Sequence, residues 1–273
     1  PFSGYKIMIV GNRGAGFMGA RDSLTSFIAI GQGGTPFMAI YPWNPGFGTK
    51  DADPATLPTQ AGKGIVFNPA GDTVALAHGN YPYTSVYPWN PGFGTKYANP
   101  GVALPAESGD VTFNPAGDTI AFAHQDYPRV SVYPWSAGFG TKYADPATLP
   151  AGTVGFALDF SPSGNDIAVS SSASPYISVY PWSAGFGTKY ANPATLPTNN
   201  ARAVTFNPAG DAIAVTCDSS PYVLVYPWSA GFGTKYANPA TLPAGGGLSV
   251  AFNPAGDTIA VGHDNSPYVS VYP

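Results

Sequence analysis

The stretch VYPWSAGFGTKYANPATLP, residues 179–197, recurs along the chain as a series of near-copies. Each near-copy carries a Tyr-Pro-Trp triplet, and every tryptophan of the protein belongs to one of these triplets. The five tryptophans, spaced by 46, 46, 47 and 46 residues, are Trp43, Trp89, Trp135, Trp182 and Trp228. A period of this regularity indicates one supersecondary unit that is copied along the chain. The chain is therefore predicted to be a repeat array.

One unit, residues 203–243, contains the signals of a small antiparallel sheet. Its expected strands are residues 203–206, 213–216, 222–226 and 232–236. The sequence Asn-Pro-Ala-Gly at 207–210 separates the first two strands, with proline and glycine where a type I turn prefers them. Pro227 lacks a backbone donor and is expected to end the third strand or to make a bulge there. Four short strands in each repeat are typical of a β-propeller blade.

The number of repeats is given by an alanine that recurs in the second expected strand. It occurs six times, at Ala29, Ala75, Ala121, Ala168, Ala214 and Ala260. A small residue beside a large apolar one suits sheets that pack face to face, where a bigger side chain would overpack the core. We therefore predict an all-β chain that forms a single six-bladed β-propeller. Its blades are expected near residues 11–58, 59–105, 106–150, 151–197, 198–243, and 244–273 with 1–10.

The ends of the chain suggest how such a ring could close. The sixth copy reaches Pro273 after its third strand, and Tyr5–Val10 is a good strand sequence at the phase of the missing outer strand. We expect residues 5–10 to pair with residues 268–272 and so to remove an exposed sheet edge. In the first copy, Gly16–Ala20 would then be the inner strand, and residues 22–25 would replace the Asn-Pro-Ala-Gly turn.

Two runs, VTFNPAGDTIA at 111–121 and SPYISVYPW at 174–182, resemble parts of a WD40-type propeller repeat. FNPAGD stands where that family has its Phe-Ser-Pro-Asp-Gly turn. Tyr-Pro replaces the family's Trp-Asp, so the buried His-Asp network of typical WD40 blades is not expected. The variant with Tyr-Pro-Trp, Gly-Phe-Gly-Thr-Lys and Ala-Thr-Leu-Pro is similar to propeller repeats in virion proteins of tailed bacteriophages.

This second resemblance implies a surface-exposed structural protein, a decoration or fibre component of a virion, or an extracellular protein. Its partners would be other virion proteins or a host-surface glycan. The alternatives are a lectin-like propeller that binds carbohydrate and, third, an intracellular WD40-type scaffold for protein–protein interaction.

Composition excludes several classes of partner. Charged residues make up 10% of the chain, far below the roughly 25% usual in soluble proteins. Lys and Arg together number 11 and the formal net charge is −4, so no basic stripe is available for nucleic acid. The sequence has no run of about 18 apolar residues, the length that a membrane-spanning helix needs. Cys217 is the single cysteine, so no intrachain disulfide can form.

A dinucleotide-binding motif appears near the N-terminus. Lys6–Val10 is followed by Gly14-Ala-Gly16-Phe-Met-Gly19, which matches G-x-G-x-x-G after a strand. A dinucleotide site also needs a helix and an acidic residue about 20 positions on, whereas Gln32–Pro36 contains no acid. The repeat phase assigns the segment to a propeller strand, so we expect no cofactor.

Other candidate chemistry is sparse. His78, His124 and His263 share one repeat position and could form a metal ring at one mouth of the channel. Ligands on separate blades seldom converge on one ion, so we favour polar residues at strand ends and expect no metal. Glu107 is the only glutamate, and the expected loops are short and nearly alike. An active site needs a convergent cluster, so we predict no enzymatic activity.

The candidate ligand or partner surface is the set of repeated tryptophans together with five repeated lysines. The lysines are Lys50, Lys96, Lys142, Lys189 and Lys235. An aromatic platform on each blade would suit multivalent glycan binding. Alternatively, each tryptophan packs with the phenylalanine four residues later and closes the outer rim, with the lysine stem laid over a ring. Sugar sites usually add an Arg or Glu, which this motif lacks, so packing is the favoured interpretation.

Overall fold

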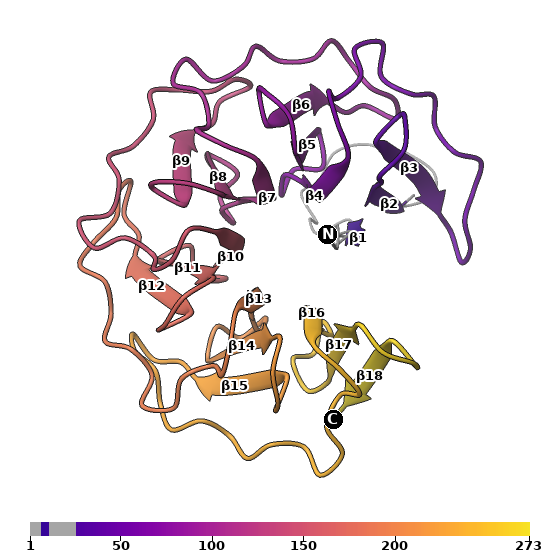
Figure 1. The fold of residues 1–273 in the computed structure, drawn as a ribbon. Coiled ribbons are helices and arrows are strands. Elements are labelled where there is room, and N and C mark those ends of the chain that lie inside the picture. The colour runs from indigo at the N-terminus through magenta and orange to yellow at the C-terminus, as the bar shows by residue number, and fades with distance from the viewer. Residues whose placement is uncertain (1–6, 11–25) are drawn as a thin grey trace.

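The computed structural model describes residues 7–10 and 26–273, and these form six three-stranded antiparallel sheets without a helix. Figure 1 shows the six sheets following one another around a common centre, with the first strand of each sheet innermost and the third outermost. The sheets are numbered one to six in chain order. The all-β architecture and the six copies predicted from the repeat are confirmed.

The strand bounds follow the repeat. Sheet one contains β1 (Ile7–Val10), β2 (Ser26–Gly31) and β3 (Met38–Trp43). Sheet two contains β4 (Gly62–Phe67), β5 (Thr73–His78) and β6 (Thr84–Pro88). Sheet three contains β7 (Ser108–Phe113), β8 (Thr119–His124) and β9 (Val130–Pro134). Sheet four contains β10 (Gly155–Phe160), β11 (Asp166–Ser171) and β12 (Ile177–Pro181). Sheet five contains β13 (Ala201–Phe206), β14 (Ala212–Cys217) and β15 (Val223–Pro227). Sheet six contains β16 (Gly247–Phe252), β17 (Ile259–His263) and β18 (Val269–Tyr272).

The turn between the first two strands of sheet five forms as its sequence predicts. The Gly210 amide donates to the Asn207 carbonyl at 3.0 Å, and Gly210 has a φ of 76°. The Asn207 side-chain oxygen also accepts from the backbone amides of Asp211 and Ala212, each at 3.0 Å. Asparagine thus satisfies amides that the turn leaves outside the strand ladder. The same pattern recurs at the turns that begin with Asn68, Asn114 and Asn253.

The predicted fourth strand, residues 232–236, is wrong, because each sheet has three strands. We name the stretch from the tryptophan to the Ala-Thr-Leu-Pro motif, residues 228–243 in this repeat, the outer segment. The outer segment lies beside β15 and is joined to it by two backbone hydrogen bonds. The amides of Gly233 and Tyr236 donate to the carbonyls of Pro227 and Val225, each at 2.9 Å. Pro227 has no amide to continue a ladder, and Gly231 has a φ of 153° that a regular strand does not adopt.

The predicted closure by the N-terminal strand is also wrong. β1 pairs antiparallel with β2 in the register Ile7↔Ile30 to Val10↔Phe27, so it is the inner strand of sheet one and not the outer strand of sheet six. Residues 7–10 are β-branched or apolar and favour a strand, whereas Gly16–Ala20 contains two glycines, which weaken one. Residues 16–20 and 22–25 lie outside the described residues.

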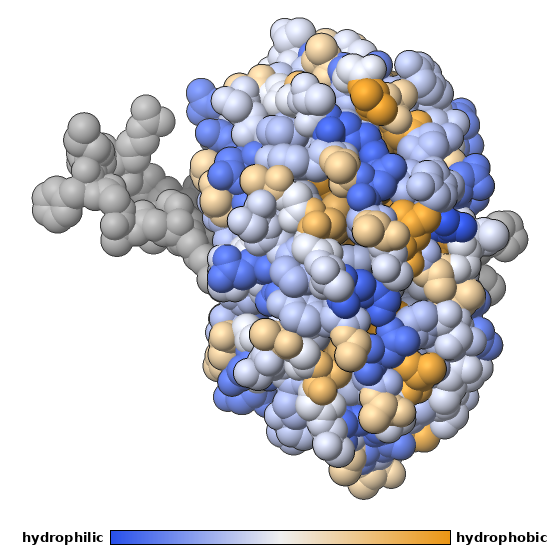
Figure 2. Space-filling model, turned by 90° about the vertical axis from the view of Figure 1, so that its left-hand side faces the viewer, coloured by the Kyte–Doolittle hydropathy of each residue, from blue (hydrophilic) through white to orange (hydrophobic). Residues whose placement is uncertain are grey.

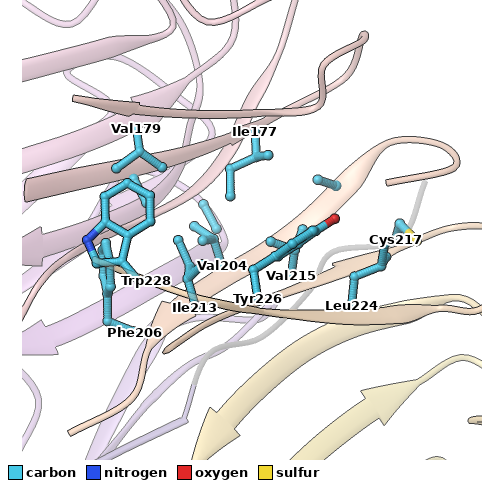
Figure 3. Packing of buried hydrophobic residues seen from close by; sticks show 13 residues of the cluster. Ile177, Val179, Val204, Phe206, Ile213, Val215, Cys217, Leu224, Tyr226 and Trp228 are labelled. Atoms are coloured by element: carbon cyan, nitrogen blue, oxygen red, sulfur yellow. The ribbon is translucent and has the colours of Figure 1, made fainter. Parts of the chain in front are cut away.

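The core lies between neighbouring sheets. Figure 3 shows Ile177 and Val179 of β12 above Trp228 and Tyr226, which belong to the next repeat. These side chains and Ala168 form one cluster in which each is at most 5% exposed. Alanine leaves room for the large aromatic side chains opposite it, which is the packing that its sixfold recurrence predicts.

The second glycine of each Gly-Phe-Gly motif approaches the proline of the third strand. A Cβ added at Gly140 would lie 2.9 Å from the Cβ of Pro134, while the Gly140 amide already donates to the Pro134 carbonyl at 2.9 Å. We expect Gly140→Ala to lower the free energy of unfolding by about 1–3 kcal/mol, as overpacking usually does. Gly101→Ala is the matched control, because a Cβ there meets nothing within 4 Å. Equal denaturant midpoints for the two variants would contradict the argument.

Candidate functional site

Four of the five repeated tryptophans lie between sheets. Trp89, Trp135, Trp182 and Trp228 are only 4–5% exposed. The Trp135 ring meets Phe113 and Phe139 of its own repeat and Tyr97 of the preceding outer segment, with centroids 5.8, 5.1 and 5.1 Å away, all edge to face. The ring therefore joins two repeats, and its burial supports the packing interpretation.

Trp43 is the exception, because no described sheet precedes it. Its side chain is half-buried and meets Phe47 with ring centroids 5.3 Å apart. Phe47 is 62% exposed, whereas its counterparts in the later repeats are half-buried. The same motif is thus solvent-exposed at the start of the array and buried along its length.

The five repeated lysines do not form one cluster. Each ammonium donates to the Asp or Asn side chain three residues later in its own outer segment. The pairs are Lys50 with Asp53, Lys96 with Asn99, Lys142 with Asp145, Lys189 with Asn192 and Lys235 with Asn238. Exposed pairs of this kind contribute at most about 1 kcal/mol each. The lysines therefore give the rim a repeated polar edge.

A tyrosine of each third strand connects consecutive repeats. The hydroxyls of Tyr87, Tyr133, Tyr180 and Tyr226 donate at 2.7–2.8 Å to the carbonyls of Thr56, Val102, Thr148 and Thr195 in the preceding outer segments. All four side chains are fully buried. Burial raises the pKa of Tyr87 and Tyr133 to about 12, so they remain hydrogen-bond donors at neutral pH. The first four outer segments are thus each held by the sheet that follows.

Each of the three histidines forms a hydrogen bond within its own sheet. The Nε2 atoms of His78, His124 and His263 lie 3.1, 3.0 and 3.0 Å from the hydroxyls of Ser85, Ser131 and Ser270 on the adjacent strand. All three rings are buried. Burial lowers the pKa of His78 and His124 to about 4. In the described part of the chain, no three His, Cys, Asp or Glu side chains gather closely enough to hold a metal ion.

Two shallow cavities lie at the rim near the third repeat. One, of ≈ 270 Å³, is lined by Asn68, Asp72, Tyr97 and Trp135, among others. The other, of ≈ 350 Å³, lies against Val102 and Lys142. The first is lined by a carboxylate, an amide and two aromatic side chains. However, Asn68 Nδ2 already donates to Asp72 Oδ1 at 2.7 Å, so these polar groups are partly used within the turn.

Sequence reasoning did not single out an exposed pair of tyrosines in the loops between the second and third strands. Tyr81 is 64% exposed and Tyr127 is 62% exposed. The Arg129 guanidinium lies over the Tyr127 ring at 5.9 Å from its centroid, and Tyr81 meets Tyr83 edge to face at 6.1 Å. The available signal was their departure from the repeat, since Ser174, Ser220 and Ser266 stand at the same position in later copies.

The dinucleotide motif at Gly14–Gly19 lies outside the described residues. Among the residues that the structure does describe, no helix is long and apolar enough to cross a membrane. Compared with known proteins, the chain matches no family model and no curated protein, so its repeat geometry carries the functional argument.

Proposed function

We propose that this chain is a non-enzymatic interaction module built as a six-bladed β-propeller. The observation that carries the proposal is the tyrosine bond between repeats, which holds each outer segment against the following sheet in four successive copies. Such interlocking suits a rigid support that presents the same edge many times. Some polar side chains pair inside a single sheet, as the His–Ser pairs do, and others pair between repeats, as Lys63 does with Glu107.

The virion location follows from the resemblance of the repeats to those of tailed-phage virion proteins. On this proposal the module decorates a particle or fibre, and its partners are other virion proteins. Figure 2 shows hydrophilic and hydrophobic residues intermixed on the side of the ring that it presents, which suits a surface that stays in contact with water.

Electron microscopy of particles from the native source tests this proposal. We expect the chain in a regular stoichiometric array on the particle surface, with six lobes visible in averages of the purified chain. Recovery of the chain only as a free protein, or turnover of a substrate in an unbiased activity screen, would contradict the proposal.

The exposed tyrosines favour carbohydrate binding as a second candidate function. Tyrosine rings in neighbouring sheets could stack on sugar rings, and two sites would bind a multivalent glycan more tightly than one. Their loops belong to sheets two and three, which are adjacent in the ring (Figure 1). This candidate uses Tyr81 and Tyr127 rather than the buried tryptophans.

The double variant Tyr81→Ser/Tyr127→Ser tests this candidate, because serine occupies the same position in three other copies. We expect its free energy of unfolding to stay within about 0.5 kcal/mol of the wild type, as at other exposed sites. Retention on a glycan column or array should fall at least about tenfold if the tyrosines bind sugar. Unchanged retention, or no retention by the wild type, would remove this candidate.

A further inference from the structure

At the junction of sheets four and five, a carboxylate accepts hydrogen bonds from two aromatic side chains. Asp166, the first residue of β11, accepts from the hydroxyl of Tyr190 at 2.9 Å and from the indole nitrogen of Trp228 at 3.2 Å. Tyr190 belongs to the outer segment of the fourth repeat, and Trp228 belongs to the fifth repeat. The carboxylate therefore satisfies both donors where the two repeats meet.

The junction of sheets two and three has the same two donors in the same arrangement. The rings of Tyr97 and Trp135 have centroids 5.1 Å apart and planes at 89°, and those of Tyr190 and Trp228 are 5.1 Å apart at 87°. Trp135 is 5% exposed, and Tyr97 is half-buried. Among the described residues, none accepts a hydrogen bond from the Tyr97 hydroxyl or the Trp135 indole. Both donors thus lack the protein acceptor that the later junction supplies.

A threonine takes the place of the carboxylate at this junction, and a cavity lies beside it. Thr73 stands at the position of Asp166, and its hydroxyl donates to Asp72 Oδ1 at 3.1 Å. The cavity of ≈ 270 Å³ is lined by the two aromatic donors together with Thr73, Asp72 and Asn68, among others. This volume is close to the lower limit of about 300 Å³ for ligand pockets, so the cavity suits one small ligand.

The polar groups of the cavity favour a ligand that both accepts and donates hydrogen bonds. The indole N–H can only donate, and an ionised carboxylate can only accept. Asp72 Oδ1 already accepts from Asn68 and Thr73, and Oδ2 has no partner among the described residues. A ligand carboxylate would face the like charge of Asp72, which is unfavourable. A ligand hydroxyl can accept from the aromatic donors and can donate to Oδ2, so a neutral polyhydroxylated ligand satisfies all of these groups.

The same set of side chains recurs at the junction of sheets three and four. The rings of Tyr143 and Trp182 have centroids 5.2 Å apart and planes at 87°. The Thr119 hydroxyl donates to Asp118 Oδ1 at 3.1 Å, and Asn114 Nδ2 donates to the same oxygen at 2.8 Å. Two successive junctions of the array (Figure 1) thus carry the same donors and acceptor.

We propose that these two junctions, between sheets two and three and between sheets three and four, each bind a neutral sugar residue. Its hydroxyls accept from the tyrosine hydroxyl and the indole N–H and donate to the aspartate. The proposal goes beyond the interaction module, and it uses neither the virion location nor the exposed Tyr81 and Tyr127. Two adjacent copies of a small site suit a glycan with several sugar residues, because simultaneous binding raises the overall affinity.

Titration of the isotope-labelled full chain with single sugars, followed through the indole N–H signals of its five tryptophans by nuclear magnetic resonance, tests the proposal. The probes are glucose, galactose, mannose and N-acetylglucosamine, with sodium acetate as the carboxylate probe. We expect at least one sugar to shift the signals of Trp135 and Trp182 saturably, and acetate to leave them unchanged. The Trp228 signal should stay in place, because its N–H is already donated to Asp166.

An exchange between sheets closes one site. Asp72→Asn/Thr73→Asp gives sheet two the asparagine–aspartate pair that sheet four carries at the same positions, 165 and 166. The new carboxylate should accept from both aromatic donors, so the sugar should no longer shift the Trp135 signal. The Trp182 signal, which reports the unaltered junction, should shift as in the wild type and serves as the internal control.

The reverse exchange opens a site where the chain has none. Asn165→Asp/Asp166→Thr removes the acceptor between sheets four and five and leaves both donors in place. We expect the Trp228 signal to shift with the same sugar that shifts Trp135 in the wild type. Circular dichroism checks that the variant folds, and the closing exchange tests the proposal by itself if it does not.

Three results would overturn the proposal. The first is the absence of a saturable indole shift with any of the sugars. The second is a shift with acetate alone, which would assign the cavity to a carboxylate ligand. The third is a Trp135 shift that survives Asp72→Asn/Thr73→Asp, which would place the sugar elsewhere. Tyr81→Ser/Tyr127→Ser should leave the indole shifts unchanged, so failure of the exposed tyrosines as a sugar site is distinguishable from failure of these junctions.

Discussion

Replacing Trp135 with alanine should lower the free energy of unfolding by about 3–5 kcal/mol, the range for large buried aromatic truncations. Trp135 is 5% exposed and contacts rings from two repeats, so its removal leaves a cavity at the junction of sheets two and three. Fixed Pro134 and buried Tyr133 flank the site, and the surrounding structure can collapse only in part. Denaturant unfolding followed by circular dichroism measures the loss.

Trp43→Ala is the matched control for this prediction. It removes the same side chain from the same motif, but Trp43 is half-buried and no sheet in the described part of the chain precedes it. We expect a loss of about 1 kcal/mol, in proportion to the smaller apolar area that it buries. Comparable losses for the two variants would show that the motif is stabilised within its own repeat. A loss below about 0.5 kcal/mol for Trp135→Ala would match an exposed ring and would reopen the platform interpretation.

Local sequence signals predicted most of each sheet. The strands expected at 203–206, 213–216 and 222–226 correspond to β13, β14 and β15 within two residues at either end. The turn at 207–210 was predictable because proline and glycine restrict the backbone within four consecutive residues. The sixfold alanine predicted face-to-face packing because it reports directly on the space between sheets.

The errors arose where the outcome depends on contacts far apart in sequence. Periodicity placed the first inner strand at 16–20, but strand propensity favours Ile7–Val10, and the repeat alone cannot choose between them. The outer segment has alternating residues like a strand, but it is held by a tyrosine hydroxyl from the following repeat, about 31 residues away in sequence, as in the bond from Tyr133 to Val102. No local pattern reveals that bond.

The candidate site residues also depend on contacts that the local sequence does not reveal. The period identified the tryptophans and lysines as equivalent positions, but it did not distinguish a buried ring from an exposed one. Trp43 and Trp135 stand in the same Tyr-Pro-Trp triplet, but a described sheet packs against Trp135 and none packs against Trp43. The exposed Tyr81 and Tyr127 were overlooked because they break the repeat, which is where a repeated scaffold can carry an individual function.

Acidification should destabilise the fold in a window set by two buried histidines. Burial, the main cause, lowers the pKa of His78 and His124 from the ordinary value of 6.5 to about 4. Between these values the unfolded chain binds protons that the folded chain excludes, so stability falls as the pH drops from about 6.5 to about 4. Each histidine should contribute a loss of about 3 kcal/mol across the window, or roughly 6 kcal/mol together.

His124→Ser isolates one of these contributions, because Ser171 occupies the same position in sheet four. The variant is expected to be less stable than the wild type at pH 7, since it loses a buried ring. The informative quantity is the slope of the unfolding free energy between pH 6.5 and pH 4, where the part contributed by the histidines should fall by about half because one of the two histidines with a lowered pKa is gone. Urea unfolding at half-unit pH intervals measures it. A slope that His124→Ser leaves unchanged would mean that His124 is protonated in the folded state, with its bond to Ser131 made by an imidazolium.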